Sequence, residues 1–140
     1  MIARVLAAGL SLNRIAFGLG YLLLPGRTGK GWIGRAARDP ATQVFIRGHG
    51  ARDVALGAGA LAMIIGDRPA PAAGWMSAQA LADGADVVAT LVSRPRLPSS
   101  GFRFALAMAG GSTAVAATTA ALLARAARRD RDGGGGDSPS

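Results

Sequence analysis

Four apolar stretches, each about as long as a membrane-spanning helix, take up most of this 140-residue chain. About 20 predominantly apolar residues are needed to cross the hydrocarbon core of a bilayer as an α-helix. The stretches are residues 5–24, 45–66, 72–92 and 104–124. They predict an all-α fold, a four-helix transmembrane bundle, with residues 1–125 as a single transmembrane domain. Residues 126–140 offer little apolar surface to bury, so we expect a disordered tail.

The last and first stretches have the clearest boundaries. Residues 104–124 form a run of 21 residues without a charge. Residues 5–24 contain Arg14 near their middle and stop at Pro25. A secretory signal peptide is the alternative for this first stretch, because Arg4 supplies a short positive region before it. No small-residue cleavage site follows Leu24, which favours a retained span.

The two middle stretches are interrupted by polar residues. The uncharged part of the second, residues 54–66, is too short to cross a bilayer, so its helix must begin earlier. Asp39-Pro40 predicts that beginning, with a carboxylate as N-cap and proline at the first helical position. The third stretch contains Asp83 and Asp86 and ends before Pro95, where proline cannot continue a helix.

The segment between the first two stretches is less regular. Residues 29–38 combine Trp32 with several basic residues, which predicts either a short interfacial segment or an ordinary loop. A soluble helical bundle is the alternative to the whole membrane interpretation, but it needs a polar face on every helix. The polar residues of the fourth stretch do not provide one: they are Ser112, Thr113, Thr118 and Thr119.

Five charged side chains lie inside these stretches, and we expect them to form one buried network. They are Arg14, Arg52, Asp53, Asp83 and Asp86. A charge at the bilayer centre costs about 2.5–3.5 kcal/mol on insertion scales, so such groups normally pair with one another. In four antiparallel spans with a rise of ~1.5 Å per residue, all five come out about 10–17 Å below one membrane face.

Helical spacing places the charges on facing surfaces. Residues 79, 83, 86 and 90 share one face of the third helix, and residues 11, 14, 18 and 21 share one face of the first. We expect Arg14 to pair with Asp83 or Asp86 and Arg52 to pair with the other, leaving a spare carboxylate. Further polar candidates are His49, Gln79, Tyr21 and Arg47, the last as a third cation. The fourth helix is expected to pack through small residues without joining this centre.

Three function classes fit these residues. The network can be purely structural, holding the first three helices together in a small membrane protein of unknown activity. Alternatively, Asp83 and Asp86 serve a small proton- or cation-coupled transporter or an accessory of one. The third class is a membrane-embedded enzyme that uses His49 with Asp53. The sequence points to no catalytic residue, cofactor or metal site, because it has a single histidine and no cysteine.

The formal net charge of +8 raises the question of nucleic-acid binding. Such binding needs basic residues clustered with stacking aromatics or a known module, whereas here the arginines border apolar runs. Arginines in that position are typical of loops at a membrane surface. We therefore expect a multi-pass protein of the bacterial inner membrane, with the lipid bilayer and not nucleic acid as partner. Its orientation, and whether it pairs with a second copy or another membrane protein, stay open.

Several motifs resemble a family of small actinobacterial membrane proteins of unknown function. The string Gly-Ala-Arg-Asp-Val-Ala-Leu-Gly at residues 50–57 carries the resemblance, followed by the paired Asp83 and Asp86. The string Arg-Ile-Ala-Phe-Gly-Leu-Gly at residues 14–20, with Leu-Pro at 24–25, fits the same pattern. The resemblance covers most of residues 1–92. It implies about four spans and no particular activity.

Overall fold

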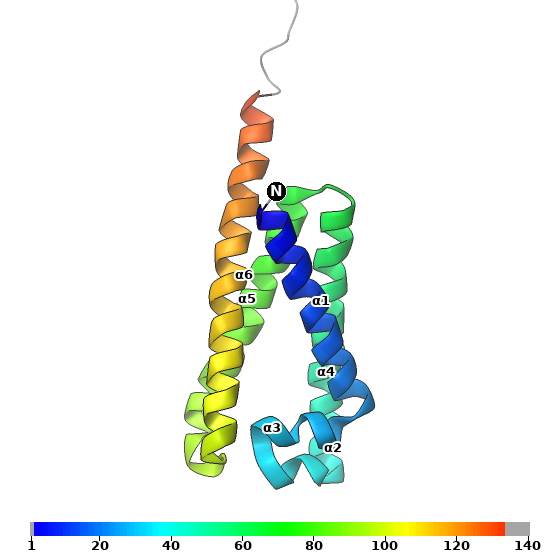
Figure 1. Cartoon of the computed structure of the whole chain (residues 1–140), viewed down its shortest axis with the longest axis vertical. Coiled ribbons are helices and arrows are strands. Elements are labelled where there is room, and N and C mark those ends of the chain that lie inside the picture. Colours follow the sequence, from blue (N-terminus) through cyan, green and yellow to red (C-terminus); the bar gives the residue numbers. More distant parts are fainter. Residues whose placement is uncertain (1, 134–140) are drawn as a thin grey trace, which may run out of the picture.

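Four long helices and four short ones form residues 2–133, the part of the chain that the computed structural model describes (Figure 1). The long helices are α1 (Ile2–Leu23), α4 (Pro40–Ile65), α5 (Pro69–Val92) and α6 (Ser99–Gly133). The short ones are α2 (Pro25–Thr28), α3 (Lys30–Ile33) and the 3-10 helices η1 (Gly34–Arg38) and η2 (Arg94–Arg96). The described chain contains no strand, so the all-α expectation is confirmed.

Local chemistry sets the helix ends much as expected. Helix α1 ends just before Pro25, and α5 ends before Pro95. Helix α4 begins after Asp39, whose carboxylate accepts a hydrogen bond of 2.8 Å from the Thr42 backbone amide. This bond satisfies one of the amides that a helix start leaves without a partner. The predicted N-cap at Asp39 is therefore confirmed.

Helix α6 is longer than the expected fourth span and extends into the residues expected to form the tail. The helix continues to Gly133, so residues 126–133 are helical. The remaining residues of that expected tail, 134–140, lie outside the described residues. Alanine and arginine, which dominate residues 124–131, are strong helix formers. Extending an existing helix adds one backbone hydrogen bond per residue without a new nucleation cost.

The long helices pack as two pairs. Helix α1 lies mainly on α4, and α5 lies mainly on α6. The pairs meet at the end where α4 turns into α5, and they separate toward the opposite end (Figure 1). There the short helices cross between them, and α3 contacts α6. This contact is close, because a Cβ on Gly101 would lie against the Trp32 carbonyl oxygen.

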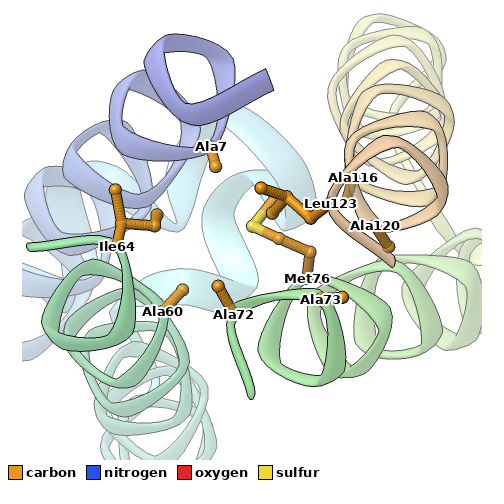
Figure 2. Packing of buried hydrophobic residues seen from close by; sticks show 9 residues of the cluster. All are labelled: Ala7, Ala60, Ile64, Ala72, Ala73, Met76, Ala116, Ala120 and Leu123. Atoms are coloured by element: carbon orange, nitrogen blue, oxygen red, sulfur yellow. The ribbon is translucent and has the colours of Figure 1, made fainter. Parts of the chain in front are cut away.

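A small apolar core joins the pairs at their meeting end, as Figure 2 shows. Met76 is its largest fully buried member, and alanines from all four long helices surround it. The members are Ala7, Ala60, Ile64, Ala72, Ala73, Met76, Ala116, Ala120 and Leu123. Small side chains let helices approach closely, so the pairs are tightly joined here.

Two of the long helices, α1 and α6, are long and apolar enough to cross a membrane. Helices α4 and α5 have sufficient length, at 26 and 24 residues, but do not reach the same apolar character. Charged side chains interrupt both of them, and the outward face of α4 carries small alanines instead of leucines. These alanines are Ala51, Ala55, Ala58 and Ala62.

Candidate functional site: a buried ion-pair network beside a cavity

Arg14 lies at the centre of the site, where it joins two helices to α1. Its side chain is 5% exposed. Nη1 donates a 2.7 Å hydrogen bond to Asp53 Oδ1 on α4, and Nη2 donates to Asp83 Oδ2 on α5. The planar guanidinium suits such a double contact, since its donors point in fixed directions. Arg14 thereby links α1, α4 and α5 at one level.

Arg52 forms the second half of the network. Its Nη2 and Nη1 donate to the two carboxylate oxygens of Asp86 at 2.7 and 3.2 Å. Arg14 with Asp83 and Arg52 with Asp86 is one of the two pairings expected from depth and helical spacing. Asp53 is not a spare carboxylate, however, because Arg52 Nη2 also donates to its Oδ1 at 3.2 Å. Asp53 therefore connects the two arginines.

Helix α6 contributes to the polar centre, contrary to the expectation that it only packs. Ser112 donates its hydroxyl hydrogen to Asp83 Oδ2, the oxygen that also accepts from Arg14. The network therefore holds four helices together and not three. The expectation failed because a single serine in an apolar helix is common, so helical spacing gives it no special weight.

The accessory polar residues divide into three groups. His49 joins the network: its Nε2 lies 3.3 Å from Arg52 Nη2 and 3.6 Å from Asp53 Oδ2. The Tyr21 ring stands edge-on to His49, with centroids 5.3 Å apart. Gln79 is fully buried nearby and donates to the Leu56 carbonyl oxygen at 3.2 Å. Arg47 does not join as a third cation, since it is exposed and lines a different groove.

A cavity of about 100 Å³ lies against this network, between the two helix pairs. Its polar side includes Arg14, Asp53, Asp83, Asp86 and His49. The apolar and aromatic side chains that complete it are Leu10, Phe17, Tyr21, Trp32, Phe104 and Met108. For scale, a 150 Å³ engineered cavity can bind benzene, so this one has room for a few waters or one very small ligand.

Some polar groups around the cavity have no partner within residues 2–133. They include Trp32 Nε1 and Thr90 Oγ1, which are buried on side chains that line the cavity. A buried polar atom without a hydrogen bond costs free energy, so these two atoms favour a polar occupant of the cavity over an apolar one. Apart from Tyr21, the aromatic wall residues were not site candidates in the sequence: Trp32 was expected only in the segment between the first two helices, and Phe17 and Phe104 had no assigned role. Helical spacing gave a weak signal for Thr90, which shares a face with Asp83 and Asp86.

The charges of the network do not balance. Two arginines stand against three aspartates, so one negative charge is in excess when His49 is counted as neutral. Within residues 2–133, no three histidine or acidic side chains are arranged to hold a metal ion. Ser112 bonds to Asp83 and not to His49, so no serine–histidine pair forms. The arrangement favours attraction of a cation over nucleophilic chemistry.

Comparisons with known proteins add no relative to this picture. No family model, no curated protein and no solved structure matches the chain.

Proposed function

We propose that the chain is a four-span membrane protein that binds a small cation in the cavity beside its ion-pair network. In this arrangement α1, α4, α5 and α6 cross the bilayer, and the short helices between α1 and α4 lie at its surface. We also propose that the chain is related to the small actinobacterial membrane proteins that its motifs resemble. Transport, or assistance to a transporter, is the activity that such a site serves.

The distribution of side chains supports the membrane placement. In the most apolar stretch of each helix, only 28% of the residues of α1 and 22% of those of α6 are buried. The core helix of a soluble protein would be mostly buried. Helix α5 also turns large apolar side chains outward, including Leu81 at 76% and Val88 at 59% exposure. Its carboxylates Asp83 and Asp86 turn inward. Charged groups inside and apolar groups outside are typical of proteins solvated by lipid.

The cavity that reaches three carboxylates is the observation that carries the functional proposal. A network that served only to hold helices together would need no space beside it, because every void forfeits packing contacts. Here the space adjoins the excess negative charge, and rings such as those of Phe17, Trp32 and Phe104 stand around it. Aromatic faces attract cations, and the attraction grows when both are desolvated.

A cavity-filling substitution separates cation binding from a structural role. We expect Ala109→Leu on the cavity wall to abolish uptake of methylammonium or protons by reconstituted liposomes, while all ion pairs stay intact. Ala107→Leu is the matched control, since Ala107 faces outward on the same helix. Asp86→Asn should also reduce uptake, because it removes the excess negative charge. Absence of uptake and of cation binding in the unmodified protein would favour the purely structural role.

A further inference from the structure

A second concave site lies at the end of the molecule where the short helices are, and it is strongly basic. This basic groove, of about 650 Å³, is lined by Arg27, Lys30, Arg38, Arg47, Gln43 and Leu24, among others. The four cations come from four different elements: α2, α3, η1 and α4. None of the residues lining the groove is acidic. The fold itself therefore gathers four positive charges around one space.

These cations are not neutralised by the rest of the described chain. The ion pairs of residues 2–133 involve other basic residues, namely Arg4, Arg14, His49 and Arg52. The nearest carboxylate in sequence, Asp39, is occupied as the N-cap of α4 and accepts from the Thr42 amide and hydroxyl at 2.8 and 2.9 Å. Like charges around one groove repel each other, and a bound anion removes that cost.

We propose that the basic groove binds the phosphate group of an anionic membrane lipid. Guanidinium groups form paired hydrogen bonds with phosphate oxygens, and the Gln43 amide adds a neutral donor. Basic pockets beside transmembrane helices bind anionic headgroups for this reason. The proposal rests on the membrane placement given above, but not on the cation cavity.

An apolar side chain within the groove favours a lipid over free phosphate. Leu24 lines the groove and is 49% exposed. Leu23, which precedes it on α1, is 73% exposed. An anionic lipid would place its phosphate among the cations and an acyl chain against Leu24. Inorganic phosphate would leave this side chain without a contact.

The test compares lipid retention by detergent-purified protein with native mass spectrometry. Phosphatidylglycerol and phosphatidylcholine are offered in equal amounts to the unmodified chain and to a groove variant with Arg27, Lys30, Arg38 and Arg47 changed to Gln. The matched control changes the same number of cations at the far end of α6, with Arg125, Arg128, Arg129 and Arg131 changed to Gln. We expect the preference for phosphatidylglycerol to fall by about fivefold per cation removed in the groove variant and to stay unchanged in the control.

Two further arms make the outcome decisive. A variant with the three groove arginines changed to Lys keeps the charge, so it should fold like the unmodified chain and retain most of the preference. An unchanged preference in the Gln variant overturns the groove as a lipid site. Displacement of phosphatidylglycerol by millimolar inorganic phosphate overturns the lipid as ligand and assigns the groove to a water-soluble phosphate. A chain that stays monodisperse without detergent contradicts the membrane placement and the lipid ligand. In that case, phosphate binding that is lost in the Gln variant would assign the groove to a water-soluble anion, and no phosphate binding would overturn the groove as an anion site.

Discussion

Gly18 of α1 and Gly50 of α4 meet backbone to backbone, with no side chain between them. A Cβ on Gly18 would lie 2.7 Å from the Gly50 carbonyl oxygen, and a Cβ on Gly50 would lie 2.6 Å from the Gly18 carbonyl oxygen. About two turns further along α4, a Cβ on Gly57 would lie 2.7 Å from the Ser11 carbonyl oxygen. Real side chains do not approach carbonyl oxygens so closely, so glycine is required for this helix contact. The contact brings Arg14 within reach of Asp53.

We predict that Gly50→Ala lowers the stability of the protein by about 1–3 kcal/mol, because a methyl group here forces α1 and α4 apart. Unfolding in detergent followed by circular dichroism measures this loss. Gly48→Ala is the matched control two residues away, since nothing lies within 4 Å of a Cβ at that position. Alanine is the better helix former, so the control should be neutral or stabilising by up to about 1 kcal/mol. Equal losses in both variants would contradict the close contact.

Arg14→Met should destabilise the protein by about 3–5 kcal/mol, because it leaves the carboxylates of Asp53 and Asp83 buried without their common partner. Asp67→Asn provides the contrast. It removes the surface ion pair between Arg4 and Asp67, whose side chains are 46% and 75% exposed. We expect a loss of less than about 1 kcal/mol in the free energy of unfolding. Thermal unfolding of both variants in the same detergent gives the comparison. A small loss for Arg14→Met would mean that the buried network is not required for folding.

Ser112→Ala tests whether α6 belongs to the network. The substitution removes a hydrogen bond to an ionised carboxylate, and we expect a loss of about 1.5–3 kcal/mol. Its neighbour Thr113 bonds only to the Ala109 carbonyl oxygen of its own helix, at 2.7 Å. Thr113→Ala should therefore change the free energy of unfolding by about 0.5 kcal/mol or less. If the two variants have the same free energy of unfolding, the hydrogen bond from Ser112 to Asp83 does not stabilise the fold.

Asp39 should make stability depend on pH in the acid range. Hydrogen bonds from the Thr42 backbone amide and then its hydroxyl lower the pKa of the Asp39 carboxyl below its ordinary value of 3.8. The ionised cap therefore stabilises the folded chain fully above the ordinary pKa, and this stabilisation is lost as the pH falls through the lowered value. Asn at the same position still accepts a hydrogen bond but does not titrate. The difference in melting temperature between the unmodified chain and Asp39→Asn should narrow as the pH is lowered from 6 to 2.5.

Helical spacing predicted a large part of the site. Asp83 and Asp86 share one face of α5, and in the structure that face meets Arg14 and Arg52, the two partners that were expected. The helix starts and ends were also predictable, since Asp39 and the prolines act locally.

Other parts depend on lateral packing, which spacing along one helix does not determine. Asp53 accepts from both arginines because α4 is rotated so that it stands between them. Ser112 reaches Asp83 because α6 packs on α5 more extensively than α4 does, although α4 and α5 are also consecutive. The basic groove likewise needs α2 and η1 to pack against α4 and α3 to lie beside them, and no pattern in residues 25–38 specifies that path.

The α1–α4 pair and the α5–α6 pair diverge from one vertex, and three kinds of contact set the angle between them. The alanine-rich core fixes the vertex. Away from it, polar links cross the angle: Arg14 with Asp83, Arg52 with Asp86, and Gln79 with the Leu56 carbonyl oxygen. At the open end α3 packs against α6, so the width of the cavity depends on the salt bridges together with this contact. A cation that competes with the arginines for their carboxylates would leave the α3–α6 contact as the main link across the open end.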